Sequence, residues 1–385
     1  MNILIEGWRG INHSYALVNQ WQIKEFIKST NIFFKDMPYI SEKWNLTQND
    51  SGFDENFKTT INKLNLPSTS QKIDITYRIA SPYNLSADFN SKLTFVFGTC
   101  EYKFLQKEAY KNGIPDLLSD NQKFFIHTPS NWSKVGFVEA GFREDQVLVV
   151  PHGVDFDIFN TTKTRSQKEI KNRFKINEGD FVITNIGAMT KNKGVDLLVV
   201  AYGILKKKFK NLKLLLKDQS NLYDIKANYL FNVVSESQFN KKYKIINDEM
   251  LKDVIIISKN LNLDEIKEIY SITDCYVSPY LAEGFNLTPL EAAACGTQIV
   301  VTKGGSTDDY FDPCLGHQIE STEKKIKINF SICEPKLDSL VHILENKIIN
   351  KPDKFKNNRS EYVKKNFSWE KTVKKLKKEF ENKIN

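Results

Sequence analysis

Two glutamates eight positions apart are the most informative chemical feature of the sequence. Glu283 and Glu291 lie in the segment 278–296, where a short apolar run passes through a glycine-containing loop into a helical pattern. Each carboxylate can accept a pair of hydroxyl hydrogen bonds, which suits a polyol such as ribose or a hexose. The start of the helix lies between them, and its N–H groups and dipole favour diphosphate oxygens.

The boundaries of that helix are predicted from its end residues. Thr288 can cap the helix, Pro289 suits its first position and Gly296 ends it. If Thr288 is the cap, Glu291 stands at the third helical position. Its role could then be structural instead of chemical, as the partner of Thr288 in a capping box. Glu283 has no such alternative, because it lies in the loop before the helix.

A second loop with unusual chemistry follows the apolar run 181–186. Gly187 ends that run, and Lys191, Lys193 and Gly194 stand just before an amphipathic stretch. Two lysines and a glycine at a helix start can neutralise a diphosphate without a metal. The alternative is that these lysines are simply solvated, as surface lysines usually are.

A third loop joins the first apolar run to a helical segment. Its glycines, one of them Gly10, allow a close backbone approach, and the helix start after Asn12 and His13 offers N–H groups to an anion. The loop does not match the dinucleotide-binding glycine pattern. An ordinary strand-to-helix turn with Ser14 as the cap is the alternative.

These loops need parallel strands to position them, because ligands of open parallel sheets bind beyond the carboxyl ends of the strands. Short β-branched runs alternate with amphipathic stretches, which predicts an α/β protein with two mostly parallel sheets. The strands predicted for the first sheet are 2–6, 31–34, 73–78, 93–98, 124–128 and 147–150. Those predicted for the second are 181–186, 212–216, 254–257, 275–278 and 298–301.

The predicted domains are 1–155, an N-terminal α/β domain, and 156–365, a C-terminal α/β domain. The linker between them is predicted within 151–164. Residues 366–385 form a C-terminal amphipathic helix with Trp369, Val373, Leu376 and Phe380 on one face. This stripe is expected to dock on the protein, with an anionic membrane surface as the alternative. Residues 36–72 receive no assignment.

The composition is that of a globular protein of 385 residues, with 41% hydrophobic residues and a formal net charge of +8. The charge favours phosphates or an anionic membrane surface, although a solvated lysine-rich surface is the simpler explanation. The start shows no export signal and no stretch reaches membrane-spanning length, so a cytoplasmic location is expected. Five scattered cysteines indicate neither disulfides nor a zinc site.

The sequence resembles the retaining glycosyltransferases of family 4, also called glycosyl transferases group 1, which have the GT-B fold. The resemblance rests on the two glutamates within EGFNLTPLEAAACG, the segment PHGVD at 151–155, TPSNWSK at 128–134 and the run NIGAMTKNKGVDLL. It is clearest from residue 93 to residue 310. It implies two Rossmann-like domains with a central cleft and a C-terminal helix that crosses back to the N-terminal domain.

The resemblance also implies roles for individual residues. Glu291 would bind the donor ribose, Glu283 the hydroxyls of the donor sugar, and Lys193 the diphosphate. Lys191 and Gly187 would lie on the same side of the donor. The loop and helix start would hold the sugar through residues Gly284, Phe285, Asn286, Leu287 and Thr288.

The implied activity is the transfer of a hexose, with retention of configuration, from a GDP- or UDP-linked donor to a hydroxyl of a glycan or lipid-linked acceptor. Neither a cofactor nor a metal is expected, and nucleic acid is not an expected partner. Asp155 and Asp157 form an Asp-x-Asp triplet like that of metal-dependent glycosyltransferases, but here it is expected to start a turn.

The sequence departs from the family at two positions. Ala188 stands where the family usually has an arginine, and Glu101 lies near the place of a usual histidine, where it is either a polar contact or merely solvated. An inert GT-B protein that binds a nucleotide sugar or a glycan is therefore an alternative. A sugar-binding protein of the periplasmic type is a third, disfavoured by the lysine-bearing loop.

Overall fold

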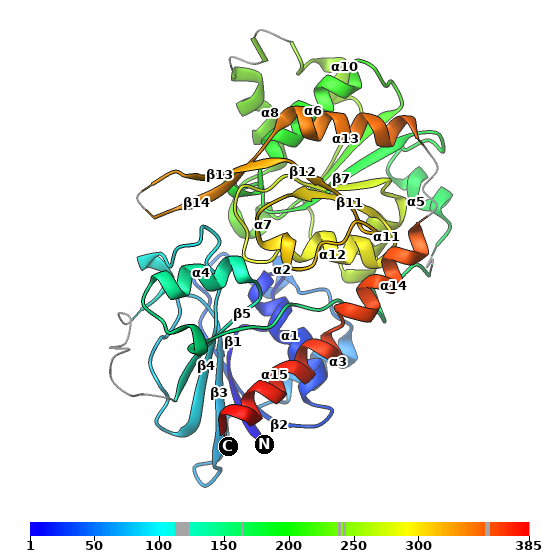
Figure 1. Ribbon diagram of the computed structural model, residues 1–385. Coiled ribbons are helices and arrows are strands. Elements are labelled where there is room, and N and C mark those ends of the chain that lie inside the picture. Colours follow the sequence, from blue (N-terminus) through cyan, green and yellow to red (C-terminus); the bar gives the residue numbers. More distant parts are fainter. Residues whose placement is uncertain are drawn as a thin grey trace. The chain divides into compact units, whose positions relative to one another are not determined.

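The structure is a computed structural model and describes residues 1–111, 123–162, 165–237, 240–241, 244–327, 329–350 and 355–384. The chain forms two compact units, shown in Figure 1. The first comprises Met1–Asp155, Lys327–Phe330 and Phe367–Asn385, and the second comprises Phe156–Ile326 and Ser331–Asn366.

The first unit is built on a six-stranded sheet in the order β2-β1-β3-β4-β5-β6, and each strand pairs in parallel with its neighbours. The inner strands β1, β3, β4 and β5 are buried along most of their length, which explains why they read as continuous apolar runs. The strands are β1 (Asn2–Gly7), β2 (Asn31–Asp36), β3 (Ile73–Ile79), β4 (Ser91–Phe97), β5 (Phe124–Thr128) and β6 (Val147–Val149).

Helical segments connect most of these strands, whereas β3 and β4 are joined by residues 80–90 without a helix. Two of the helices fall in residues 36–72, to which the sequence had given no assignment. The helical segments of the first unit are α1 (Ser14–Phe26), α2 (Leu46–Asn49), α3 (Glu55–Asn62), η1 (Lys107–Ala109), α4 (Asn131–Glu139), η2 (Glu144–Gln146) and α15 (Trp369–Ile384).

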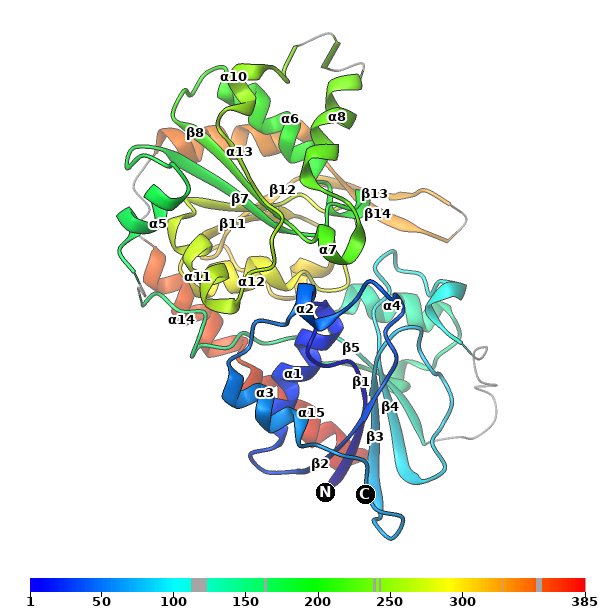
Figure 2. The same ribbon diagram turned by 180° about the vertical axis from the view of Figure 1, so that it is seen from behind.

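The C-terminal helix α15 belongs to the first unit, although the chain has passed through the second unit before reaching it. In both ribbon views it lies beside α1 (Figures 1 and 2). The ring of Phe380 is fully buried, with its centroid 4.4 Å from that of Phe95 in β4 and 6.2 Å from that of Phe26 in α1. Trp369, Val373 and Leu376 are buried as well. The prediction that this stripe docks on the protein is confirmed.

The second unit is also built on a parallel six-stranded sheet, in the order β12-β11-β10-β7-β8-β9, with a separate antiparallel hairpin of β13 and β14. The strands are β7 (Phe181–Gly187), β8 (Leu212–Asp218), β9 (Val254–Ile257), β10 (Cys275–Ser278), β11 (Gln298–Thr302), β12 (Gly316–Ile319), β13 (Ser321–Lys325) and β14 (Ser331–Pro335).

Helices cover both faces of this sheet (Figures 1 and 2). The helical segments are α5 (Gln167–Arg173), η3 (Lys191–Lys193), α6 (Val195–Lys206), α7 (Ser220–Tyr223), α8 (Ala227–Glu236), α10 (Asp248–Leu251), α11 (Leu263–Ile272), α12 (Leu287–Ala294), η4 (Ser306–Asp309), α13 (Leu337–Ile349) and α14 (Lys356–Asn366).

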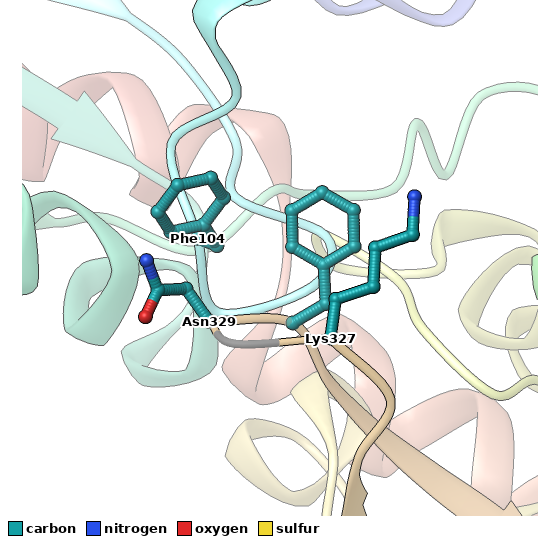
Figure 3. Close-up of a pocket in the computed structure, with 4 residues that line it drawn as sticks. Phe104, Lys327 and Asn329 are labelled. Atoms are coloured by element: carbon teal, nitrogen blue, oxygen red, sulfur yellow. The ribbon is translucent and has the colours of Figure 1, made fainter.

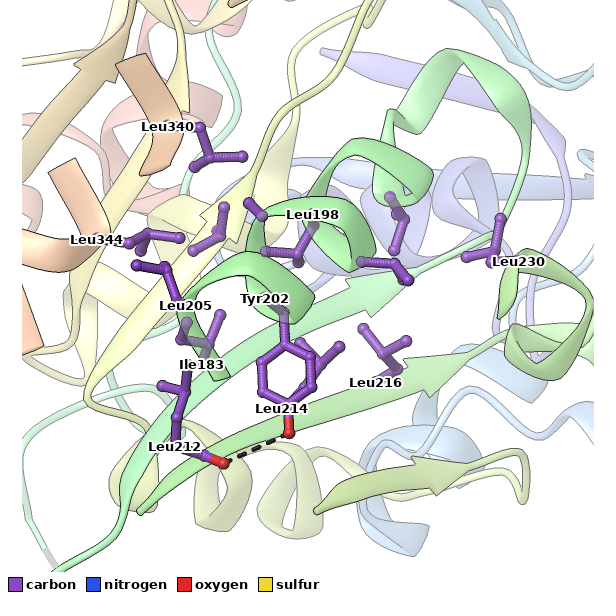
Figure 4. Packing of buried hydrophobic residues seen from close by; sticks show 14 of the residues in the cluster. Ile183, Leu198, Tyr202, Leu205, Leu212, Leu214, Leu216, Leu230, Leu340 and Leu344 are labelled. Carbon is purple, nitrogen blue, oxygen red and sulfur yellow. Dashed lines mark hydrogen bonds between the residues drawn. The ribbon is translucent and has the colours of Figure 1, made fainter. Parts of the chain in front are cut away.

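The core on one face of the second sheet joins β7 and β8 to α6, α8 and α13 (Figure 4). Leu198 of α6, Leu214 of β8 and Leu340 of α13 are all fully buried there. Tyr202 also lies in this core, and its hydroxyl donates a hydrogen bond to the carbonyl of Leu212 at 3.4 Å. These contacts fix the strands whose ends carry the candidate site.

The predicted strands of both sheets are confirmed, with differences of one or two residues at their ends. The sequence missed β12, β13 and β14, because β12 carries glycine, histidine and glutamine and β13 is almost entirely polar. In the predicted linker, the Val154 N–H donates to the carbonyl of Phe367 at 2.8 Å, while Lys163 and Thr164 lie outside the described residues. Among the described helices, none is both long and apolar enough to span a bilayer.

Candidate functional site

The N-terminus of α12 follows the carboxyl end of the central strand β10. The helix begins at Leu287, so Asn286 is the cap residue and the predicted cap, Thr288, occupies the second helical position instead. Asn286 adopts a left-handed conformation (φ 68°) and turns its side-chain amide to the Ser278 Oγ at 2.8 Å. That side chain therefore gives no capping hydrogen bond to the first turn of α12. A helix start without a side-chain cap is suited to an anion.

Glu291 is half-buried on α12 and is not part of a capping box. The capping-box alternative is wrong because the helix begins two residues earlier than expected, which makes Glu291 its fifth residue instead of its third. Its Oε2 accepts a hydrogen bond from the Tyr270 hydroxyl at 3.0 Å. Burial raises the pKa of Glu291 to about 8, although the hydrogen bond from Tyr270 acts in the opposite direction. The carboxyl group thus contacts the Tyr270 hydroxyl and has no capping role.

The loop after β7 brings a lysine to the same edge of the sheet. Lys193 ends the short helix η3, and its Nζ lies 2.5 Å from the Glu283 Oε1. The Glu283 side chain is only 7% exposed and that of Lys193 is 26% exposed. Burying a carboxylate is costly unless a cation pairs with it. The ion pair therefore keeps both the Lys193 ammonium group and the Glu283 carboxylate in the site before any ligand binds.

Asn192 fastens the β7 loop to the β10 loop. Its carbonyl accepts from the Leu281 N–H at 2.7 Å, and its side-chain amide donates to the Ala282 carbonyl at 3.1 Å. The next glycine, Gly194, has a φ of 63°, and a Cβ there would lie 2.0 Å from the Pro279 carbonyl oxygen. Only glycine allows this approach, so the sequence specifies the contact that brings Lys193 and Glu283 together.

The loop from Gly284 to Asn286 is buried, and Tyr310, from the loop after the neighbouring strand β11, holds it in place. The Tyr310 hydroxyl donates to the Asn286 carbonyl at 2.8 Å, and the Tyr310 ring packs against Phe285 with centroids 5.2 Å apart. The backbone expected to hold a sugar is therefore fixed by side chains rather than left mobile.

Three tyrosines of the site were missed in the sequence. Tyr270 contacts Glu291, Tyr310 fixes the Asn286 loop, and the Tyr276 hydroxyl lies 2.7 Å from the Thr288 Oγ1 and 3.0 Å from the Ile186 carbonyl. Tyr276 belongs to the predicted strand 275–278, so its position beside the strand ends could have been noticed. Nothing in the local sequence signals Tyr270 or Tyr310.

The other lysine and the small residues of the β7 loop lie beside this pair. Lys191 begins η3, and Gly187 ends β7 with an extended backbone (φ 156°). Ala188 is buried, 7% exposed. The structure therefore brings Lys193, Glu283 and the start of α12 together at the carboxyl ends of β7 and β10, with Lys191 on the same short helix as Lys193.

The candidates of the first unit occupy a separate loop after β1. The Gly10 N–H donates to the Gln20 side chain at 3.1 Å, and the Asn12 N–H donates to the Asn49 carbonyl at 2.7 Å. Both groups already have acceptors in the protein. His13, not Ser14, is the cap of α1, since its Nδ1 accepts from the Tyr15 N–H at 3.2 Å.

His13 is also part of an aromatic cluster, with its ring 4.8 Å from that of Trp44. Burial lowers the pKa of His13 to about 4, so the ring is neutral at pH 7 and brings no positive charge to this loop. Glu101 is half-exposed after β4, and its carbonyl accepts from the Trp132 indole at 2.6 Å.

The Asp-x-Asp triplet lies at the end of the first unit and the start of the second. Asp155 pairs with Lys24 at 2.5 Å, and the carbonyl of Asp157 accepts a hydrogen bond from the side chain of Asn160 at 3.4 Å within a turn. In the described part of the chain, no group of three or more histidine, cysteine, aspartate or glutamate residues is arranged to hold a metal ion. The expectation of metal-independent transfer stays a prediction.

Comparison with known proteins finds a matching family model and similar proteins. Residues 166–316 match the family model of the glycosyl transferases group 1. A D-inositol 3-phosphate glycosyltransferase of Paenarthrobacter aurescens is 28% identical over 161 residues, which is 42% of this chain and 36% of that protein. A mannosylfructose-phosphate synthase of Agrobacterium fabrum is 27% identical over 167 residues, 43% of this chain and 35% of that protein. The match thus spans little more than a third of each relative.

Solved structures resemble the whole chain. A glycosyltransferase from Rickettsia africae superposes with a TM-score of 0.68 at 14% identity, covering 100% of this chain and 99% of that one. The Anabaena protein HepE in complex with UDP-glucose superposes with a TM-score of 0.66 at 13% identity, covering 99% and 100%. At such identities the likeness concerns the fold alone.

The two parallel sheets and the returning helix α15 define a two-domain α/β protein of the GT-B class. Within it, the segment 166–316, which matches the family model of the glycosyl transferases group 1, carries Lys193, Glu283 and Glu291.

Proposed function

We propose that the protein is a retaining glycosyltransferase of family 4 that transfers a hexose from a nucleoside diphosphate sugar to a hydroxyl of a glycan or lipid-linked acceptor. The observation that carries the proposal is the ion pair of Lys193 and Glu283 beside the start of α12. A cation, a carboxylate and a helix N-terminus at neighbouring strand ends provide for both parts of such a donor, its diphosphate and its sugar hydroxyls.

Each group has a distinct role in this proposal. Lys193 and the first turn of α12 bind the diphosphate and stabilise the charge that grows on it as the glycosidic bond breaks. Glu283 accepts hydrogen bonds from hexose hydroxyls, and Glu291 accepts them from the ribose. When the donor binds, the Lys193 ammonium group also pairs with the diphosphate. Hydrogen bonds from the sugar hydroxyls then compensate the Glu283 carboxylate for the weaker ion pair.

The transfer step breaks the bond between the anomeric carbon and the diphosphate oxygen and forms one from the same carbon to the acceptor oxygen. The acceptor attacks from the face that the diphosphate leaves, so the configuration is retained. The acceptor proton passes to the departing diphosphate oxygen. The glutamates act as binding groups here and not as the acid and base of a glycosidase.

The relatives support the donor class. The matched proteins include a D-inositol 3-phosphate glycosyltransferase and a mannosylfructose-phosphate synthase, and HepE has been crystallised with UDP and with UDP-glucose. A GDP- or UDP-linked hexose is therefore the donor that we propose. No metal takes part in the proposed step.

Ala188 favours one alternative function. It stands where the resembling family usually carries an arginine, and its methyl side chain brings no charge to the diphosphate. A protein that binds a nucleotide sugar without efficient transfer is thus the second candidate. Turnover of UDP- and GDP-hexoses with release of the nucleoside diphosphate distinguishes it from an active transferase.

The test of the diphosphate site compares UDP with uridine by calorimetry in Lys193→Gln. We expect the affinity for UDP to fall about 10- to 100-fold, the scale of a lost charge-assisted hydrogen bond, and the affinity for uridine to stay within about twofold. The exposed Lys168→Gln on α5 is the matched control and should change neither affinity. Equal losses for both ligands, or no loss for UDP, contradict the assignment.

A further inference from the structure

An aromatic pocket of the first unit includes none of the residues assigned above. Phe104, Lys327, Asn329 and Phe330 line a shallow, open pocket of about 470 Å³, and the surface that they expose to it is mainly apolar (Figure 3). The volume lies within the range of small-molecule sites. The pocket could not be predicted from the sequence, because Phe104 precedes the other three residues by more than two hundred positions.

Three rings meet in this pocket. The Phe330 ring stacks on that of Tyr102, with centroids 5.3 Å apart and planes at 21°, and lies 5.2 Å from that of Phe104. All three side chains are only half-buried. Aromatic faces that remain partly open to water can still accept a ligand, since a ring face carries partial negative charge and a large apolar area.

The segment that presents two of these rings is rigidly placed. Lys103, between Tyr102 and Phe104, has a φ of 54°, a left-handed conformation that costs a residue with a Cβ about 1–2 kcal/mol. A Cβ on Gly136 of α4 would lie 2.7 Å from the Lys103 carbonyl carbon, so the segment is packed closely against that helix. Strained backbone held in this way is a common feature of binding sites.

Polar groups flank the rings on two sides. In Figure 3 the Asn329 amide lies beside Phe104, and the Lys327 side chain lies on the other side of the pocket. The Lys327 Nζ is 5.3 Å from the centre of the Phe330 ring, and both polar side chains are exposed. An amide both donates and accepts hydrogen bonds, and an ammonium group donates three.

This combination fits a sugar ring. One face of a pyranose carries C–H groups that can lie against aromatic faces, while its equatorial hydroxyls point outward to donors and acceptors around them. A fatty chain would leave the amide and the ammonium group without a role.

We propose that Phe104, Phe330, Asn329 and Lys327 form a subsite for a pyranose unit of the acceptor glycan. This inference rests on the proposed glycosyltransferase function and specifies its acceptor as one that presents a sugar ring. The subsite holds an acceptor sugar by ring stacking and takes no part in the bond-forming step.

Saturation-transfer NMR on the full chain tests the subsite with methyl α-D-glucopyranoside and methyl α-D-mannopyranoside as probes. We expect saturation of the C–H protons of one pyranose face, reduced at least fivefold in Phe330→Ala. Phe330→Leu, which keeps apolar volume but lacks a ring face, should lose the signal to the same extent. Phe89→Ala is the matched control, because Phe89 is 94% exposed elsewhere in the first unit.

Calorimetry with UDP on the same variants separates this inference from the proposed function. Unchanged UDP affinity together with loss of the sugar signal supports the subsite. Absence of a sugar signal in the unaltered protein, or full signal in Phe330→Leu, overturns it. Failure of the unaltered protein to bind either UDP or GDP overturns the proposed function instead, whatever the sugars do.

Discussion

The raised pKa of Glu291 makes the stability of the protein depend on pH in a direction opposite to that of most carboxylates. Burial on α12 raises this pKa from its ordinary value of 4.5 to about 8. Between these two pH values the folded protein holds a proton that the unfolded chain has released. Stability therefore falls as the pH rises from 4.5 to 8, and the full loss is present above pH 8.

The magnitude follows from the size of the shift. A difference of about 3.5 pKa units at about 1.4 kcal/mol each sets an upper limit of about 5 kcal/mol. Glu291 retains partial contact with water, which screens its charge, so we expect about 1–3 kcal/mol. In Glu291→Gln the amide keeps the shape and can still accept the hydrogen bond from Tyr270, but it does not titrate.

Urea unfolding at pH 5 and pH 9 measures the effect. Relative to the unaltered protein, Glu291→Gln should gain about 1–3 kcal/mol of unfolding free energy at pH 9 and much less at pH 5. Glu236→Gln, an exposed glutamate at the end of α8, is the matched control and should show no such pH-dependent difference. A constant difference between Glu291→Gln and the unaltered protein across this range would refute the reasoning, as would a gain only at low pH.

Three further predictions follow from the geometry. Transfer should survive saturating chelator, and Asp157→Asn should leave UDP affinity within about twofold, since the diphosphate charge is met by lysine and a helix end; a turnover loss that magnesium or manganese restores contradicts this. Gly194→Ala should cost about 2–4 kcal/mol of unfolding free energy and weaken UDP binding, because of its φ of 63° and the Pro279 carbonyl 2.0 Å from the new Cβ. Gly179→Ala, with nothing within 4 Å, should cost much less, and equal effects would be inconsistent with the close approach. Phe380→Ala should cost about 3–5 kcal/mol in urea unfolding, and a cost under about 1 kcal/mol would mean that α15 contributes little to the first unit.

Much of the fold could be predicted from the sequence because its main signals are local. Strands buried on both faces, such as β5 and β10, are continuous apolar runs, and helix-period stripes mark segments such as α15. The polar strands β12 and β13 escaped prediction because their pairing partners, and not their own side chains, make them strands.

In the candidate site, too, the local signals could be predicted from the sequence and the contacts between distant residues could not. The residue types and spacing of Lys193, Glu283 and Glu291 were sufficient to select the loops after β7 and β10, because parallel strands end at one edge of a sheet. The start of α12 was predicted wrongly, since Thr288 is a good cap by propensity and yet the positive φ of Asn286 sets the first turn earlier.

The sequence by itself determined the two α/β sheets, the loops that carry the chemistry and the glycine that lets two of those loops touch. Only the tertiary structure decided that Lys193 pairs with Glu283, that Tyr270 rather than the helix backbone contacts Glu291, and that Phe104 meets Phe330. The physical reason is the range of the interactions. Propensity and periodicity act over a few neighbouring residues, whereas an ion pair between residues 90 positions apart exists only after packing has brought both side chains to one place.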